Sequence, residues 1–317
     1  MNVDSLLLPR PRDYLKTEEG LMFAVVSADL IDNDRIVGCL RYIPTTHGLK
    51  KLSTSDANNY LKTNYPYYLY ASKQMDTVVH AVPLAQVQQH YQPVKRLQQI
   101  CAHPADYLET LVAHVADYFS SQGLKANALG ISGSILISAH RTASDIDLVV
   151  YGRNNFLMAR SCLRELFSRD NSQHFIQPLS EEQWLQTWQR RGCDLSLDNY
   201  IWHEKRKYNK ACVDGVKFDL SMVDASTLNS QTYHKQSLVT LNAMIIDDSK
   251  AYDYPSRYII DDPQVNQILS YSATYTGQAI RGELIEARGI LEKSANGECR
   301  LLVGSSREAC GEYLKVM

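Results

Sequence analysis

The segment GISGSILISAHRTASDIDLVVYG, residues 130–152, constrains the fold of this chain more than any other part of the sequence. Its second half, DIDLVVY, is apolar and β-branched enough to form a buried strand, yet Asp145 and Asp147 stand at alternate positions where the strand begins. A carboxylate at the edge of a core is costly unless a partner neutralises it, and two carboxylates on one face repel each other. The segment therefore predicts a buried strand that begins at a site for positive charge.

The spacing of the two aspartates indicates what that positive charge is. Residues two apart in a strand point to the same face, about 7 Å apart along the backbone, so Asp145 and Asp147 can direct both carboxylates at one point. Hard cations such as Mg²⁺ accept a few carboxylates together with substrate phosphate oxygens. The pair predicts a seat for a metal-bound nucleotide, with Mg²⁺ as the expected ion and Mn²⁺ as the alternative. The competing interpretation is a solvated strand end without a ligand.

The first half of the segment offers groups that can hold phosphate. Gly133 permits close approach of the backbone, and Ser134 follows at the predicted start of a helix, where unpaired amide groups can bind a terminal phosphate. The ten residues 135–144 are enough for a short helix and a turn before the strand. His140 and Arg141 lie between the two halves, and this position makes them candidates for contact with the nucleotide.

A serine hydrolase is the competing interpretation of GISGS, because a nucleophile elbow places a serine between two glycines. Ser132 would be the nucleophile, but the closing position is Ser134 rather than glycine. A serine hydrolase also gives no reason for the Asp-x-Asp strand. Metal-dependent chemistry is therefore the favoured interpretation of the segment.

A glycine–serine pair, an Asp-apolar-Asp strand about ten residues later and a further aspartate between apolar residues together resemble the DNA polymerase beta-like nucleotidyltransferase superfamily. The matching pieces are GS at residues 133–134, DID at residues 145–147 and FDL with Asp219. The resemblance implies that Asp145 and Asp147 bind both the nucleotide metal and the catalytic metal. It implies further that Asp219, on a neighbouring strand, ligates the catalytic metal and helps to activate the acceptor. An edge-strand aspartate that faces water is the alternative for Asp219.

The whole chain is also similar to uncharacterised archaeal and bacterial proteins with a nucleotidyltransferase domain, through segments such as GLMFAVVS, WHEKRKYN and GQAIRGELIEARG. The segment WHEKRKYNKACVDGVK carries four basic residues, Lys205, Arg206, Lys207 and Lys210. They can neutralise triphosphate charge or guide an acidic acceptor, and Lys205 and Arg206 are the candidates for contact with the nucleotide. A solvated helix face is an equally good interpretation. His203, in the same segment, is expected to be a packing or capping residue.

Composition and charge limit the partners of the protein. The formal net charge of −2 argues against a general polyanion binder, so any nucleic acid must be held locally. The seven cysteines form no CxxC pair and fit reduced thiols better than a disulfide framework. No apolar run is long enough for a signal-peptide core or a membrane span. The sequence therefore predicts a cytoplasmic protein without a membrane partner.

Changes in apolar pattern divide the chain into three predicted domains of a protein of the α/β (α+β) class. Residues 1–92 are predicted as a small α+β domain, residues 93–224 as a central mixed-sheet nucleotidyltransferase domain, and residues 225–317 as a mainly β domain. Within the first domain a helix is predicted over residues 55–65, capped by Ser55 or Asp56. Within the second, a polar loop is predicted between the helix that ends near Ser168 and the helix that begins near Leu195.

These observations predict a metal-dependent nucleotidyltransferase, in which an acceptor hydroxyl attacks the α-phosphorus of a nucleoside triphosphate such as ATP and pyrophosphate leaves. The acceptor is open between an RNA end, a protein hydroxyl and a small molecule, because the same three carboxylates serve all of them. The alternative is a catalytically silent RNA- or nucleotide-binding protein that keeps the fold. The three intact carboxylates favour the enzyme.

Overall fold

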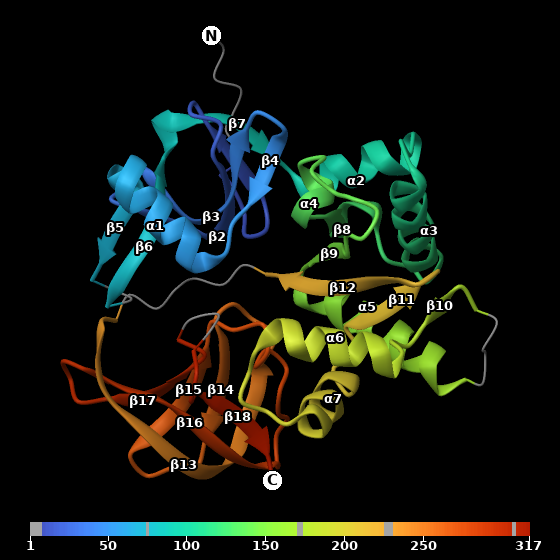
Figure 1. Ribbon diagram of the computed structural model, residues 1–317. Helices are drawn as coiled ribbons and strands as arrows, with labels where there is room; N and C mark the ends of the chain where they lie inside the picture. The colour runs from blue at the N-terminus through green and yellow to red at the C-terminus, as the bar shows by residue number, and fades with distance from the viewer. Residues whose placement is uncertain (1–7, 74–75, 170–173, 225–230, 306–308) are drawn as a thin grey trace. The chain divides into compact units, whose positions relative to one another are not determined.

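The computed structural model describes residues 8–73, 76–169, 174–224, 231–305 and 309–317 (Figure 1). Within these ranges the chain is an α+β protein with seven α-helices and eighteen strands in three sheets. The mixed class predicted from the sequence is thus confirmed, while the layout of a nucleotidyltransferase domain stays a prediction. None of the described helices is both long and apolar enough to span a membrane.

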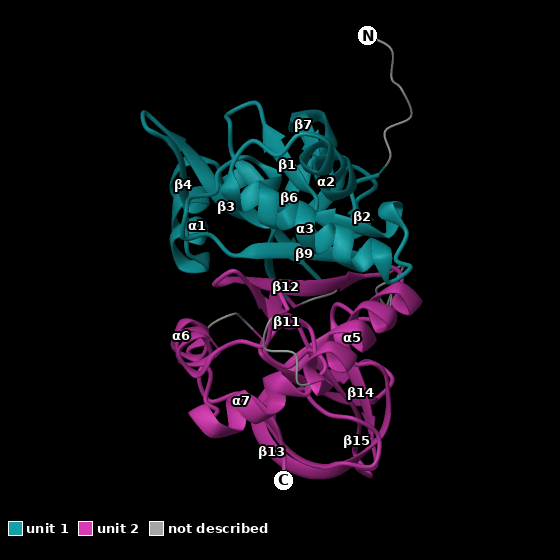
Figure 2. Cartoon of the chain, turned by 90° about the vertical axis from the view of Figure 1, so that its right-hand side faces the viewer, with its two compact units in different colours: residues 1–73, 77–151 teal, residues 74–76, 152–317 magenta. Residues whose placement is uncertain are grey.

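The chain divides into two compact units, coloured separately in Figure 2. The first unit runs to residue 151, apart from residues 74–76, which group with the second unit, residues 152–317. The division therefore falls directly after the strand that follows Asp145 and carries Asp147. The boundaries after residues 92 and 224 stay predictions.

The first unit begins with a seven-stranded antiparallel sheet in the order β5-β6-β3-β2-β1-β7, with β4 paired to β3. Its strands are β1 (Tyr14–Thr17), β2 (Met22–Ile31), β3 (Arg35–Thr45), β4 (Gly48–Lys51), β5 (Leu69–Ser72), β6 (Thr77–Pro83) and β7 (Val87–Tyr91). One face of this sheet packs on α1 (Thr54–Asn64), and Phe23, Leu40 and Leu61 are fully buried between them. Burial of these apolar side chains stabilises the layer.

The helix predicted over residues 55–65 begins at Thr54. Its N-cap is Ser53, whose side chain accepts a hydrogen bond from the backbone N–H of Asp56 at 3.0 Å. The predicted caps Ser55 and Asp56 are wrong, because both residues lie inside the first turn. Ser53 lies three residues before Asp56, which is the spacing at which an N-cap hydroxyl accepts from a backbone N–H. The negative charge of Asp56 is favourable near the positive end of the helix.

The second half of the first unit holds the segment that the sequence singled out. Its elements are α2 (Pro93–Ala102), α3 (Tyr107–Ser121), β8 (Leu129–Ile131), α4 (Gly133–Leu136) and β9 (Ile146–Tyr151). Strands β8 and β9 pair antiparallel, with Ile131 opposite Leu148. The chain therefore leaves β8, makes one turn of helix and returns along β9, as the sequence predicted for residues 133–147.

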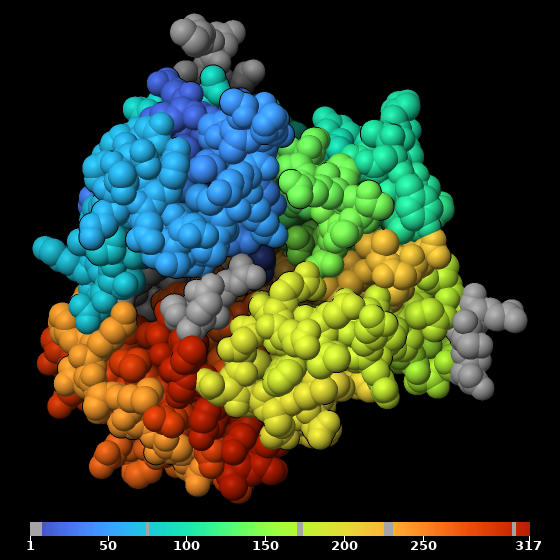
Figure 3. Space-filling model, in the orientation of Figure 1, coloured from blue at the N-terminus to red at the C-terminus, as the bar shows by residue number. Residues whose placement is uncertain are grey.

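The second unit starts with three helices and an antiparallel strand set, β10-β11-β12. These elements are α5 (Arg153–Ser168), β10 (Ile176–Gln177), α6 (Glu181–Arg191), α7 (Leu197–Lys205), β11 (Lys210–Val213) and β12 (Val216–Val223). Figure 3 shows α6 and α7, in yellow, at the surface of this unit. Strand β12 carries Asp219, in the apolar setting predicted from VKFDLSMV.

The polar loop predicted after residue 168 is wrong, because helix α6 lies within it. Ser180 Oγ accepts from the Gln183 N–H at 3.2 Å, and the Gln183 side chain accepts from the Ser180 N–H at 3.0 Å, which together form a capping box. Gly192 ends the helix in the left-handed conformation, with φ of 59°. Only two side chains of α6 are buried, so the helix has no long apolar stripe, and its signals stand at its two ends.

The rest of the second unit is a ring of strands. They are β13 (Tyr233–Lys250), β14 (Ser256–Ile260), β15 (Val265–Ser270), β16 (Leu284–Ser294), β17 (Cys299–Val303) and β18 (Tyr313–Val316). The order is β13-β14-β15-β17-β16-β18, and β13 also pairs with β16, so the pairings run in a closed circuit. Ile268, Ile285 and Leu301 are fully buried in the core of this ring.

Candidate functional site

Gly133 and Asp147 lie in contact in the first unit. A Cβ atom added to Gly133 would overlap the Asp147 carboxylate, and the φ of Gly133 is +64°. Both facts require glycine at this position, because only glycine leaves the space and adopts this backbone conformation readily. The backbone N–H of Ser132 donates to Asp147 O at 2.8 Å and fixes the two segments together. The structure thus brings together two residues that the sequence predicted to share a site.

Asp147 lies in strand β9, and Asp145 lies one residue before this strand. Ile146 and Leu148 are fully buried, whereas Asp145 is half-buried and Asp147 is exposed. Val149 and Val150 are buried as well. The two aspartates therefore stand at the start of a buried strand, and their common metal site stays a prediction.

Ser134 follows Gly133 in the first turn of α4 and is half-buried. Its backbone oxygen accepts from the Ala139 N–H at 2.8 Å, which closes the turn after the helix. Helix α4 has only four residues, so its macrodipole is small and any phosphate here would be held by individual N–H groups and the hydroxyl.

His140 and Arg141 take different places in the loop between α4 and β9. His140 Nε2 lies 2.7 Å from Asp106 Oδ2, and Asp106 is also the N-cap of α3. Arg141 is exposed, and its backbone N–H donates to Ser144 Oγ at 2.9 Å. A nucleotide that contacts His140 would therefore have to share the imidazole ring with the Asp106 carboxylate.

His140 belongs to a second cluster of side chains that contains two carboxylates. The ligand atoms of Asp106, Glu109 and His140 lie within 4.8 Å of one another. Each has a structural role, since Asp106 caps α3 and binds His140, while Glu109 pairs with Arg96 and accepts from the Ala105 N–H at 2.9 Å. These contacts account for the group without a metal ion.

Asp219 belongs to the second unit and lies opposite Lys210 in the β11–β12 hairpin. Its Oδ2 accepts from Lys217 Nζ at 2.8 Å, whereas its buried Oδ1 has no hydrogen-bond partner among the described residues. Burial raises the pKa of Asp219, but the ammonium groups of Lys217 and Lys210 together with the Arg191 guanidinium lower it further, so the net shift is downward. Asp219 is therefore an ionised carboxylate with one oxygen open to a further cation.

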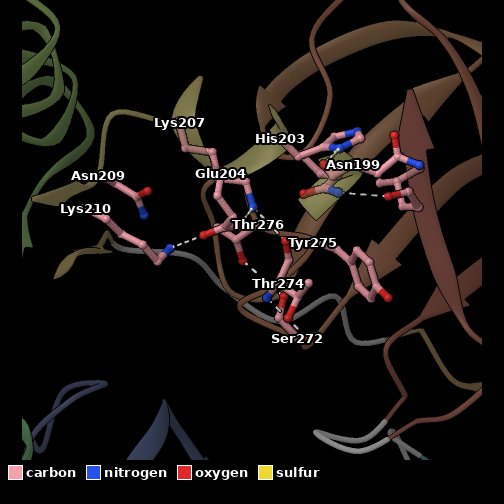
Figure 4. A network of polar contacts seen from close by, with 12 residues as sticks. Asn199, His203, Glu204, Lys207, Asn209, Lys210, Ser272, Thr274, Tyr275 and Thr276 are labelled. Atoms are coloured by element: carbon pink, nitrogen blue, oxygen red, sulfur yellow. Dashed lines mark hydrogen bonds and ion pairs between the residues drawn. The ribbon is translucent and has the colours of Figure 1, made fainter. Parts of the chain in front are cut away.

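The basic residues next to Asp219 are mostly buried in ion pairs (Figure 4). Lys207 and Lys210 both pair with the carboxylate of Glu204, and Lys207 Nζ also donates to Thr274 O at 2.6 Å. Burial lowers the pKa of Lys207 to about 8, although Glu204 opposes the shift. The side chains of Lys207 and Lys210 are 1% and 5% exposed, which excludes the solvated helix face considered for them.

Lys205 and Arg206, the two predicted nucleotide contacts of this segment, differ in their surroundings. Lys205 is exposed at the end of α7. Arg206 pairs with Glu283, and its guanidinium lies 4.4 Å from the centroid of the Trp202 ring. The ion pair and the ring contact both hold Arg206 within the second unit, so a phosphate would have to compete with Glu283 for it.

His203 is a packing residue, as expected. Its side chain is buried, Nε2 accepts from the Val316 N–H at 3.0 Å, and Nδ1 lies 2.6 Å from Asn199 O. Because Nε2 is an acceptor, Nδ1 carries the proton and donates to Asn199 O. Burial lowers the pKa of His203 to about 4, so the ring is neutral and links α7 to β18.

Two tyrosines beside Asp147 were missed by the sequence analysis. Burial raises the pKa of Tyr42, and the charge of Asp147 raises it further while Arg41 opposes the shift. The pKa of Tyr14 is raised by burial and Tyr42 first, with a smaller contribution from Asp147. Both tyrosines belong to one buried cluster with Leu136 of α4, so the N-terminal sheet borders this helix, and no local pattern in RIVGCLRYIP signals it.

The fold and the site define an α+β protein of two units, with an aspartate pair beside an obligatory glycine in one unit and a lysine-paired aspartate in the other. No family model and no solved structure matches the chain. A curated relative, "Uncharacterized protein MJ1086" of Methanocaldococcus jannaschii, is 30% identical over 340 residues, which cover 97% of this chain and 98% of the relative. The chain belongs to the same family as this archaeal protein, and the similarity includes both units.

Proposed function

We propose that the protein is a metal-dependent nucleotidyltransferase that transfers a nucleoside monophosphate from a nucleoside triphosphate to an acceptor hydroxyl. The observation that carries the proposal is the contact of Gly133 with the Asp147 carboxylate, which stands two residues after Asp145 at the start of a buried strand. A phosphate seated on the Gly133–Ser134 backbone would lie beside carboxylates that can hold its metal. ATP is the first substrate to test.

The carboxylates fit a hard divalent cation. Asp145 and Asp147 offer carboxylate oxygens two residues apart in the chain, and Asp219 keeps Oδ1 without a partner among the described residues while its charge is retained. Carboxylates of this kind are the ligands that Mg²⁺ and Mn²⁺ prefer. When bound, the metal would neutralise phosphate charge and lower the pKa of the attacking hydroxyl.

The residues of the chain have distinct roles in the proposed reaction. Gly133 leaves room for the Asp147 carboxylate, and the backbone N–H groups and hydroxyl at Ser134 orient the terminal phosphate. Asp219, the third carboxylate, would sit beside the acceptor hydroxyl and favour loss of its proton. The acceptor oxygen forms a bond to the α-phosphorus, the bond between the α-phosphorus and the bridging oxygen breaks, and pyrophosphate leaves.

The first test is the double variant Asp145→Asn/Asp147→Asn. It removes two like charges that stand two residues apart, so we expect unchanged or slightly higher thermal stability. Because the variant lacks the proposed metal ligands, we also expect loss of Mg²⁺-dependent ATP binding in calorimetry. Asp117→Asn, an exposed aspartate on α3, is the matched control and should bind as the parent does. Equal ATP affinity in the double variant and the parent would contradict the proposed metal site.

The acceptor is tested separately, since an RNA end, a protein hydroxyl and a small molecule all suit the three carboxylates. The parent chain is incubated with cell extract and ATP labelled at the α-phosphate, and the label is sought in RNA, protein and small-molecule fractions. The fraction that gains label with the parent, and not with the double variant, contains the acceptor.

One observation favours the alternative, a catalytically silent nucleotide- or RNA-binding protein. Lys217 Nζ pairs with Asp219 Oδ2 at 2.8 Å, so an ammonium group already neutralises part of the charge that a catalytic metal would need. Such a protein would bind nucleotide or RNA without transfer to any acceptor. The labelling experiment distinguishes the two functions, because only the enzyme produces labelled acceptor.

A further inference from the structure

Three exposed apolar side chains form a row across the strand ring of the second unit. Met244 on β13 lies opposite Leu284 on β16. The backbone N–H of Met317, directly after β18, donates to Leu284 O at 2.9 Å, which continues the row onto a third strand. Directly opposed residues share one face of a sheet, with Cβ atoms about 5 Å apart. The three side chains therefore lie side by side.

The row lies on the outside of the ring. The adjacent strand residues Ala243, Ile245 and Ile285 are buried in the core of the ring, whereas the side chains of the row are exposed. Ile246, two residues after Met244, is exposed as well, in keeping with the alternation of a strand. A strand face in contact with water usually carries polar side chains. This end of the ring instead presents an apolar outer face.

Two further exposed apolar side chains adjoin the row through Glu283, the residue before Leu284. The Glu283 carboxylate accepts from the Ile280 N–H at 2.9 Å. It also pairs with Arg206, whose guanidinium lies 4.4 Å from the centroid of the Trp202 ring on α7. Figure 1 shows α7 beside β18. The resulting apolar patch consists of six side chains that are 43% to 66% exposed: Trp202, Met244, Ile246, Ile280, Leu284 and Met317.

The apolar patch is large for the surface of a single chain. Six side chains of ordinary size with these exposed fractions leave roughly 600 Å² in contact with water, and the largest patch on a typical monomer has about 300–600 Å² and is often functional. A stable interface of standard size buries about 800 Å² on each partner. The apolar patch therefore has the area for most of one side of such an interface.

The charges at the rim of the apolar patch are balanced. Arg206 pairs with Glu283, and Lys315 pairs with Glu286 at 2.8 Å on the strands that carry the row. A strongly charged partner would be matched by a rim of the opposite sign. Two copies of one surface related by a two-fold axis instead bring cations of one copy near anions of the other, so a balanced rim fits a second copy of this chain.

The backbone of β18 is already bonded on the side away from β16. Val316 N–H donates to His203 Nε2 at 3.0 Å, and Gln278 Nε2 donates to Leu314 O at 3.0 Å. A partner at this end of the ring would therefore meet the side chains of the outer face rather than the backbone of β18.

We propose that the apolar patch is the interface of a symmetric homodimer. In a two-fold contact both copies use the same residues, so one apolar patch on each chain is sufficient. Burial of apolar area provides the driving force, and the flexible thioethers of Met244 and Met317 adapt to the facing surface. The dimer is independent of the proposed transfer reaction, since it involves none of the three carboxylates.

The test is the oligomeric state of the full chain, measured by sedimentation velocity over a range of micromolar concentrations. The parent should sediment as a dimer. Leu284→Lys places a charge in the interface twice, once from each copy, so it should raise the dissociation constant at least about hundredfold. Ile280→Lys makes the same kind of change outside the strands and serves if Leu284→Lys fails to fold. Leu157→Lys, at a similarly exposed position on α5, is the matched control and should dimerise as the parent does.

Oxidation of methionines by hydrogen peroxide locates the interface. Met244 and Met317 should be oxidised at least about threefold more slowly in the parent than in Leu284→Lys, because the dimer covers both thioethers. Met158, exposed on α5, is the internal control and should react equally in both. A parent that is monomeric at every concentration overturns the inference. A dimer that survives both lysine variants, or one in which Met244 and Met317 gain no protection, overturns it as well.

Discussion

At the scale of single residues, Asp219 separates the enzyme from the silent binder. In the proposed scheme its open oxygen acts on the catalytic metal and the attacking hydroxyl, an interaction that strengthens only in the transition state. Asp219→Asn should therefore leave ATP affinity within a few fold of the parent while transfer falls by orders of magnitude. Binding is measured by calorimetry and transfer by label release, with Asp214→Asn on the exposed turn before β12 as the control. A parent without transfer, and a variant that keeps all binding, would contradict the enzyme.

Glu204 supports the surroundings of Asp219 and sets a pH dependence of stability. Burial raises its pKa, but Lys207 and Lys210 lower it more strongly, to about 2. Between its ordinary value and about 2 the unfolded chain binds a proton that the folded chain does not. The stability that Glu204 contributes is therefore complete above its ordinary pKa and is lost as the pH falls through that window.

Glu204→Gln leaves two buried ammonium groups without their carboxylate, so at pH 7 the free energy of unfolding should fall by about 3–5 kcal/mol. The difference between parent and variant should shrink as the pH falls below 4.5, the ordinary value for glutamate. Urea midpoints at pH 7, 5 and 3 measure it. The contribution of His203 to stability also falls on acidification. Because His203 is present in both proteins, this change cancels when the two are compared. A constant difference across this range would contradict the pairing.

The residues of the candidate site were predictable to the extent that local spacing determines their contacts. The positions of Gly133, Ser134 and Asp147 could be predicted, because the chain there forms a strand, a turn of helix and a returning strand. The place of Tyr42 did not follow, because β3 has a β-bulge between Leu40 and Tyr42, and a bulge is a property of pairing with another strand, here β2. The burial of Lys207 and Lys210 was equally hidden, since it depends on segments far along the chain, such as the one that carries Thr274.

At the scale of elements, α6 shows which helices a periodicity analysis overlooks. The residues between the two ends of α6 are mainly polar. The capping box at Ser180 and the glycine at residue 192 were therefore the only strong local signals. By contrast, helix α5 and strands β9 and β12 were recognised, because their apolar patterns extend over several residues. The cap of α1 was misplaced by two residues or more because three consecutive positions, Ser53, Thr54 and Ser55, all carry hydroxyls.

The capping box of α6 gives a prediction about stability. Ser180→Ala removes the acceptor for the Gln183 N–H, so the free energy of unfolding should fall by about 1 kcal/mol. Ser168→Ala at the exposed end of α5 is the control and should change it by less than about 0.5 kcal/mol. Denaturant unfolding measures both. If the free energy of unfolding falls no more than in the control, the helix does not depend on this cap.

At the scale of the whole molecule, the three predicted carboxylates are divided between the two units. Asp145 and Asp147 lie in the unit that ends at residue 151, and Asp219 lies in the other. The three predicted domains rest on local composition, which does not record which segments contact one another, and their boundaries stay predictions. The family relationship extends over nearly the full length of both proteins, so a function proposed for this chain can also be tested in its archaeal relative.

The closed circuit of strands in the second unit has a consequence for how the protein behaves at high concentration. In an open sheet the outermost backbone N–H and C=O groups invite strands of other molecules to add on, which is a common beginning of aggregation. Among the described residues, β14, β15, β16 and β17 each have partners on both sides, whereas β13 pairs with β16 over its first part and with β14 over its last part. These four strands therefore cannot serve as a template for fibril growth unless the ring first opens.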